Sequence, residues 1–389
     1  MPSRKTLMLL LFIFIYGTMG LMYRPLVPLY LDELEIEPFM VGLTLAAYPV
    51  IPALLSLWAS KVIGWLQIRQ LLMAGTAMVA IGCLALGLSE NLVVISLGHM
   101  ISGTSTMMVV VASQSYIYQV SRPHMVARNF SLLVGSFSLA DILGPSLGGS
   151  LARMVGFQQA FLLISLGAIG AWMVSLSFGR EKIKQPSNIR VSWSLARQVL
   201  SSPQYVLSLV IVVAAITILT LTLSFYPLHL SRLGYSAQMV GLFLSFRGLG
   251  QLASPLGMAF LERRIGRSGV FIGASILSLA SLLLIPLVAS PGPLLVISML
   301  LGCSFGLMIP ISLVSATEGS TADTRVFALG MRFAFNRTMD ALGPVIFGAG
   351  VQMAGLTAPF YITAVMVGAV LVVVYKRRGY LEARLDARA

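Results

Sequence analysis

Long runs of apolar residues recur along this chain, with short polar segments between them. There are twelve such runs of about 20 residues, and each can cross a bilayer as an α-helix. They cover residues 7–31, 39–60, 70–89, 92–118, 129–152, 157–178, 204–230, 238–261, 268–289, 293–317, 326–351 and 356–375. The pattern predicts an all-α membrane protein with twelve transmembrane helices, which has the lipid bilayer as its surroundings.

The twelve runs fall into two copies of one unit. The segment DILGP at residues 141–145 returns as DALGP at residues 340–344, so the offset is 340 − 141 = 199 residues. The same offset places PLYLDELEIEPFMVGLTL (28–45) over PLHLSRLGYSAQMVGLFL (227–244). A duplicated hydrophobic chain is typical of secondary transporters. We therefore expect two six-helix bundles related by internal duplication, at residues 1–178 and 204–389, with a cytoplasmic linker at 179–203.

Composition and charge agree with a membrane protein and predict its orientation. Hydrophobic residues make up 57% of the chain and charged residues 10%, against about 25% charged in soluble domains. If the N-terminus lies inside, twenty of the 26 Lys and Arg residues lie on the inner side, whereas Arg153 and Arg232 lie outside. This predicts cytoplasmic termini in a plasma (inner) membrane. Because the basic residues behind the net charge of +13 are scattered over short loops, we expect no nucleic-acid partner.

Patterns of an enzyme active site are missing from the sequence. The three histidines lie on different segments, and no HExxH, GxSxG, P-loop or CxxC pattern occurs. We therefore expect that the protein is not an enzyme and holds no metal and no cofactor. We also expect a monomer that binds a small-molecule substrate. A membrane sensor that keeps a transporter-like shape and a channel remain as alternatives.

Three short motifs resemble those of a known family. GPSLGG at residues 144–149 matches a GPxxGG core, although Ala140 stands where a glycine usually precedes it. GHMISG at 98–103 is similar to a GRxxxG pattern, with His99 in place of arginine, and ERRIGR at 262–267 resembles a loop motif whose first-repeat copy has lost its acid. These segments resemble the drug–proton antiporters of the major facilitator superfamily. The resemblance implies proton-coupled efflux of a small organic solute, with helix 5 against helix 8 and helix 11 against helix 2.

The glycine-proline motif has a physical meaning of its own. A proline inside a helix removes a hydrogen bond and bends the axis, and flanking glycines allow close helix contact. A bent helix at the boundary between bundles would act in gating, and ordinary close packing is the alternative. The expected gating residues are Gly144, Pro145, Gly148, Gly149, Gly343 and Pro344.

Six charged residues lie within the predicted spans, where ionisable groups mark pathways or partners. They are Arg24, Asp141, Arg247, Arg332, Arg337 and Asp340. At about 1.5 Å per residue, Asp141 lies roughly 18 Å and Arg247 roughly 21 Å from the inner edge. The resemblance places helix 5 beside helix 8, so together with these similar depths it implies an ion pair between Asp141 and Arg247 across the boundary, unless each group finds its partner within its own bundle.

The two carboxylates at membrane depth, Asp141 and Asp340, are the expected proton-coupling groups. Asp340 has arginines on its own helix, so we expect a structural or substrate-linked acid there. Asp141 has no basic neighbour on its helix, so its protonation should follow Arg247 and the position of the bundles. This favours Asp141 as the proton carrier.

Polar side chains on several spans are expected to line the substrate cavity. Four arginines against two aspartates leave a charge of +2 within the spans. This excess favours an anionic or zwitterionic solute and keeps open the alternative of proton-coupled metabolite uptake. The expected cavity residues are Tyr23, Arg24, His99, Gln114, Arg247 and Asn336.

Overall fold

The computed structural model describes residues 3–56, 66–179, 182, 193–321 and 323–382. The predicted end of the second span (57–60) and residues 180–181 and 183–192 of the linker lie outside the described residues. The first half contains α1 (Arg4–Tyr23), α2 (Leu26–Glu33), α3 (Pro38–Leu55), α5 (Ile68–Leu88), α6 (Leu92–Val120), the 3₁₀ turn η1 (Pro123–Met125), α7 (Val126–Val155) and α8 (Phe157–Ser175). The short helix α9 (Trp193–Leu200) follows.

The second half repeats this order of helices. It contains α10 (Pro203–Leu223), α11 (Phe225–Arg232), α12 (Ala237–Ala253), η2 (Ser254–Gly257), α13 (Met258–Leu284), η3 (Ile285–Leu287), α14 (Pro291–Glu318), α15 (Arg325–Ala354), α16 (Ala358–Lys376) and α17 (Gly379–Glu382). Helix α15 illustrates the repeat, because adding 199 to the bounds of α7 gives 325 and 354. Likewise, adding 199 to the bounds of α2 gives 225 and 232, which are those of α11.

Ten described helical segments are long and apolar enough to cross a bilayer. One of them, Ala237–Leu287, has 51 residues and contains two spans, because the chain turns at Gly266. The φ of 72° at Gly266 lies in the left-handed region, which glycine enters without steric cost. Helix α15 completes the set of twelve with its 30 residues, and its arginines and aspartate make it the most polar span. The predicted fold of twelve helices is confirmed.

The first span of each repeat is interrupted in its second half. In the first repeat, Arg24 and Pro25 separate α1 from α2, and Pro25 has no N–H for the helix ladder. In the second, Ser224 separates α10 from α11, with φ −116° and ψ −79°. Both interruptions therefore lie at the same place in the repeat and, as described below, next to the same pocket.

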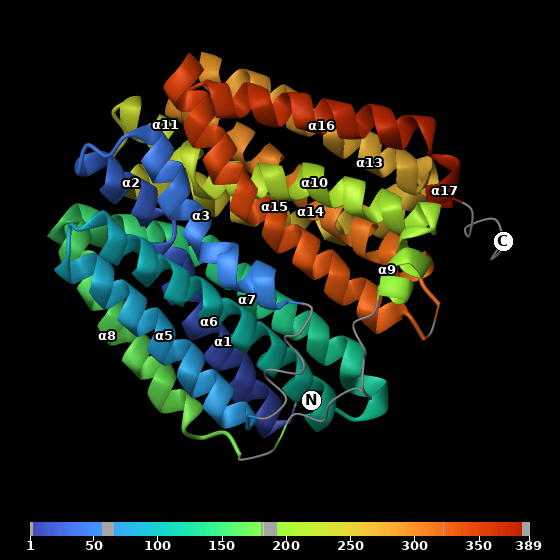
Figure 1. Cartoon of the computed structure of the whole chain (residues 1–389), viewed down its shortest axis with the longest axis horizontal. Helices are drawn as coiled ribbons and strands as arrows, with labels where there is room; N and C mark the ends of the chain where they lie inside the picture. Colours follow the sequence, from blue (N-terminus) through green and yellow to red (C-terminus); the bar gives the residue numbers. More distant parts are fainter. Residues whose placement is uncertain (1–2, 57–65, 180–181, 183–192, 322, 383–389) are drawn as a thin grey trace.

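The helices form two bundles that meet along four helices (Figure 1). Across this boundary α3 packs against α15, and α7 packs against α12. We call the contact surface made by these four helices the seam. In span numbers these are helices 2 with 11 and 5 with 8, so the arrangement expected from the sequence is confirmed. The bundles approach each other at the end that carries α2 and α11, and diverge toward the end that carries both termini (Figure 1).

Glycines allow the two bundles to touch backbone to backbone at the seam. A Cβ atom on Gly42 would lie 2.2 Å from the carbonyl oxygen of Pro344, and one on Gly241 would lie 2.2 Å from that of Pro145. Real Cβ atoms do not come so close to oxygen, so only glycine fits at both places. The two contacts are related by the 199-residue offset. The repeated glycine segment and the repeated DxLGP segment of the sequence therefore contact each other across the seam, and the repeat produces this contact twice.

The glycines of the expected gating motif divide between two kinds of contact. Gly149 faces the seam, since its Cβ would lie 2.1 Å from the carbonyl oxygen of Ala237 in α12. Gly144 and Gly148 instead face α1 in their own bundle, and Gly343 faces Thr220 in α10. The motif thus packs α7 and α15 on two sides at once.

Candidate functional site: buried ion pairs at the seam

A buried ion pair joins the two bundles between α7 and α12. The Nη2 atom of Arg247 donates to both carboxylate oxygens of Asp141 at 2.6 Å, and its Nη1 atom donates to Gln251 at 2.9 Å. The arginine is 2% exposed and the aspartate 8%. The predicted pair is therefore confirmed. Removing either partner of such a pair is costly, because it leaves a buried charge uncompensated.

A second ion pair crosses the boundary between bundles at Asp340 on α15. Its carboxylate accepts from Nη2 of Arg24 at 3.3 and 3.5 Å, from Nη1 of Arg337 at 3.3 Å and from Oγ1 of Thr220 at 3.0 Å. Arg24 belongs to the first bundle, whereas Arg337 and Thr220 belong to the second. The spacing of three residues on α15 brings Arg337 to this carboxylate. One carboxylate thus contacts two guanidinium groups here.

The repeat relates the two aspartates but not their arginines. Asp141 and Asp340 are equivalent, and subtracting 199 from Arg247 leads to Tyr48 on α3. The guanidinium of Arg24 lies over the Tyr48 ring, 4.3 Å from its centroid. An arginine stacked on a tyrosine gains a cation–π interaction. The two aspartates are therefore paired by arginines from different helices. Asp141 pairs with Arg247 on α12, whereas Asp340 pairs with Arg24, which lies between α1 and α2.

A small pocket lies beside Asp340 at the centre of the molecule. Its lining includes Arg24, His99, Thr220, Ser224 and Asp340. The pocket volume is about 10 Å³, which is close to the minimum that holds one water molecule. No solute of organic size fits this space in the conformation described here.

His99 brings an unpartnered polar atom to this pocket. The residue is 1% exposed, and its Nδ1 has no hydrogen-bond partner among the described residues. Its ring packs against those of Tyr48 and Tyr23, with centroids 5.0 and 6.0 Å away. The hydroxyl of Tyr23 also has no partner among them, although Tyr23 itself does not line the pocket.

The other expected cavity residues lie away from the pocket. Gln114 is exposed on α6, 15 residues beyond His99, and Arg247 is held by Asp141 and Gln251 in the seam. Asn336 is half-buried on α15, with no partner for its side-chain oxygen in the described part of the chain. The structure thus places Arg24 and His99 together in the central pocket, and Gln114, Arg247 and Asn336 outside it.

Tyr48, Thr220 and Ser224 also contribute to the pocket region, beside the six expected cavity residues. The repeat offset was the signal that points to Tyr48, since it is the equivalent of Arg247. The seventh span offers four hydroxyl side chains as candidates, and Thr220 lies on α10 while Ser224 ends it. Only the packing of α10 against α15 shows which hydroxyl reaches Asp340.

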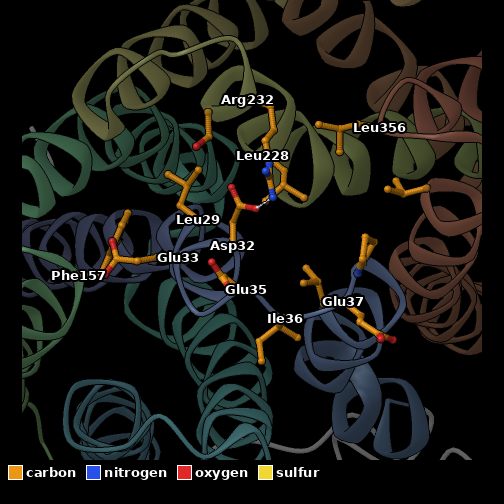
Figure 2. Close-up of a pocket in the computed structure, with 14 residues that line it drawn as sticks. Leu29, Asp32, Glu33, Glu35, Ile36, Glu37, Phe157, Leu228, Arg232 and Leu356 are labelled. Carbon is orange, nitrogen blue, oxygen red and sulfur yellow. Dashed lines mark hydrogen bonds and ion pairs between the residues drawn. The ribbon is translucent and has the colours of Figure 1, made fainter.

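A wider pocket opens at the end of the molecule that carries α2 and α11 (Figure 2). Its volume is about 1100 Å³, and its lining includes Asp32, Glu33, Glu35 and Glu37. Arg232 from α11 points into it and donates to Asp32 at 2.5 Å (Figure 2). The acidic loop, interpreted from the sequence as a solvated segment, therefore also forms the wall of this pocket. The buried ion pairs lie at the boundary of the bundles and not in this pocket, so we take the central pocket as the candidate substrate site.

Several polar contacts join the two bundles at the end that carries α2 and α11. Arg153 donates to Gln238 at 2.5 Å, the hydroxyls of Ser146 and Ser245 are 2.6 Å apart, and Arg232 donates to Asp32. The bundles are therefore held together at this end.

Two six-helix bundles with charges buried along their boundary define a membrane carrier fold. The family model of the Major Facilitator Superfamily matches residues 9–263 and 209–387, and the chain belongs to this family of transporters. Among curated relatives, the quinolone resistance protein NorA of Staphylococcus aureus (strain MRSA252) is 23% identical over 91% of this chain and 92% of its own. The multidrug resistance protein MdtG of Citrobacter koseri is 26% identical over 90% and 89%.

Solved structures show the same fold. The nucleoside transporter NupG has a TM-score of 0.76 at 14% identity, covering 97% of this chain and 99% of its own. A bacterial homologue of the lysosomal transporter Spinster, described as inward-facing and unoccupied, has a TM-score of 0.74 at 12% identity, over 98% and 97%. At this identity the likeness concerns the fold. The chain is thus an integral membrane protein of a transporter family.

Proposed function

We propose that this transporter works by alternating access and couples the movement of a small organic solute to protons, with efflux as its direction. The observation that carries the proposal is the pair of carboxylates, Asp141 and Asp340, each of which bridges to an arginine of the other bundle at equivalent places in the repeat. Any movement of one bundle against the other acts on these two bridges.

Protonation gives a physical means of weakening such a bridge. A proton on Asp141 removes the negative charge that holds Arg247, so the two bundles are tied less strongly across α7 and α12. A neutral acid also moves through a closed, dry state at lower cost than a carboxylate. This supports Asp141 as the proton carrier.

The direction and the orientation rest on sequence and on relatives. The excess of basic residues around the terminal end supports an orientation with both termini in the cytoplasm, in a plasma (inner) membrane. In this orientation the conformation described here is closed toward the outside. NorA and MdtG carry drug-resistance names, which favours efflux, whereas the surplus of arginine favours the alternative, the uptake of an anionic or zwitterionic metabolite.

Transport by reconstituted protein tests the proposal. Liposomes with the purified protein are compared under an imposed pH gradient and under substrate exchange without a gradient, with a solute chosen from a thermal-shift screen. The Asp141→Asn variant should lose gradient-driven accumulation and keep exchange, because it carries substrate but no proton. The Arg232→Gln variant, with its exposed arginine, should keep both. Full gradient-driven accumulation by Asp141→Asn would show that another group carries the proton.

A further inference from the structure

The central site holds one positive charge more than its own residues neutralise. Arg24 and Arg337 both contact the single carboxylate of Asp340, and each of these two arginines is 17% exposed. In the other ion pair, by contrast, one carboxylate faces one guanidinium at 2.6 Å. A buried charge without a counter-charge is costly. The surplus therefore calls for an anion that the protein itself does not supply.

Arg24 is the arginine that can release Asp340 most readily. Its two contacts with the carboxylate are long, at 3.3 and 3.5 Å, and its guanidinium is also held by stacking on Tyr48. If Arg24 turned to another anion, Asp340 would still keep Arg337 and Thr220 on its own side of the boundary. Two arginines, one aspartate and one added monoanion leave no net charge.

Two further features of the pocket face an incoming anion. His99 is almost fully buried and lines the pocket with a ring nitrogen that has no partner in the described chain. Helix α11 begins at Phe225, directly after the pocket residue Ser224, whose hydroxyl donates to the carbonyl of Thr220 and not to the helix start. The start of a helix favours negative charge.

We propose that Asp340 occupies the place of the substrate's anionic group, and that the substrate is a water-soluble organic anion whose carboxylate-sized group replaces Asp340 on Arg24. This inference rests on the proposed transport function and names its substrate class. It also gives the substrate a mechanical effect. Binding of the anion at Arg24 breaks the ion pair between Arg24 and Asp340 on α15. Only the Asp141–Arg247 pair of the two buried ion pairs then still joins the bundles.

Equilibrium binding to the purified full chain in detergent tests this inference without any transport. The melting temperature is measured with acetate, benzoate and glutamate, with the neutral probe benzamide and with the cation benzylamine, at constant ionic strength. At least one anion should stabilise the protein, and benzamide and benzylamine should not. In Asp340→Asn the internal competitor is gone, so the dissociation constant of that anion should fall about tenfold or more.

The control variants separate binding from folding. The variant Arg24→Gln lacks the arginine that would receive the anion, and it leaves Asp340 paired with Arg337 and Thr220. The site then has no surplus charge, so this variant should fold and should bind no anion. Arg232→Gln should bind as the unchanged protein does. Stabilisation by benzylamine and not by the anions, failure of all three anions to bind Asp340→Asn, or anion binding by Arg24→Gln would each overturn the inference.

Two other outcomes are also decisive. Phosphatidylglycerol is titrated into the same micelles. A rise in melting temperature with this lipid but with none of the soluble anions would assign the site to a lipid headgroup and would overturn the proposal of a water-soluble substrate. Absence of flux in liposomes, together with anion binding at Arg24, would refute the transport function and leave the anion site standing. The two proposals therefore fail separately.

Discussion

At the scale of single residues, the molecule holds two aspartates in different surroundings at equivalent places of the repeat. Asp141 has one arginine at short distance and Asp340 has two at longer distance. A tight one-to-one pair resists separation until its charge changes. A shared carboxylate can give up one partner and keep the other. This difference is the physical basis for assigning the proton to one acid and the substrate to the other.

The Asp141–Arg247 pair leads to a prediction about stability. Asp141→Asn and Arg247→Gln should each destabilise the protein by about 3–5 kcal/mol, because each leaves a buried charge without its partner. The double variant should be more stable than either single variant. Thermal unfolding in detergent gives the comparison as a double-mutant cycle.

The matched control is the exposed pair of Asp32 and Arg232. The arginine side chain there is 66% exposed, so Arg232→Gln should cost at most about 1 kcal/mol. If the losses of Asp141→Asn and Arg247→Gln simply added in the double variant, the two charges would not stabilise each other in solution.

At the scale of elements, glycine decides how closely the helices of the seam approach. Gly42 on α3 and Gly241 on α12 each lie against the carbonyl of a proline in the opposite bundle. A backbone carbonyl inside a helix cannot turn aside as a side chain can. Helices α7 and α15, each with a proline inside, therefore set the distance between the bundles through these two contacts.

Adding one methyl group at either contact should weaken the closed end. Gly42→Ala and Gly241→Ala should each cost about 1–3 kcal/mol by overpacking and should lengthen the distance between spin labels at Glu33→Cys and Leu233→Cys. Gly170→Ala on α8 is the control, since no atom lies within 4 Å of its Cβ position. Unchanged label distances in both seam variants would mean that the seam adjusts to a side chain.

At the scale of the whole molecule, closure at the α2 and α11 end requires the bundles to separate there during a transport cycle. The Asp32–Arg232 contact joins α2 to α11, which belong to different bundles, at the edge of the wide acidic pocket (Figure 2). The exposed pair itself adds little stability. Its value is that it marks a place where a covalent link would hold the bundles together.

A chemical cross-link at this place should stop transport. With Asp32→Cys and Arg232→Cys, a short bis-methanethiosulfonate reagent should reduce flux in liposomes to background, and a reducing agent should restore it. The control is Glu90→Cys with Gln158→Cys, whose native side chains are 3.1 Å apart within the first bundle. Undiminished flux in the cross-linked Asp32/Arg232 variant would contradict alternating access through this end.

The sequence by itself determined the features that depend on local composition and on the repeat. The twelve spans follow from runs of apolar residues, because a helix in lipid satisfies its own backbone groups. The offset of 199 residues predicted two bundles, because it depends only on position along the chain, which the sequence states directly. The Asp141–Arg247 pair was predicted from depth along the helices together with the family resemblance, which places helix 5 beside helix 8.

Only the tertiary structure decided which side chains meet at the centre. Four arginines lie within the spans, and their positions along the chain do not show that Arg24, 316 residues away from Asp340, reaches its carboxylate beside Arg337. The partner depends on how each helix is rotated and tilted, and these angles are set by packing against its neighbours. The stacking of Arg24 on Tyr48, the unpartnered His99 and the small size of the central pocket all follow from that packing.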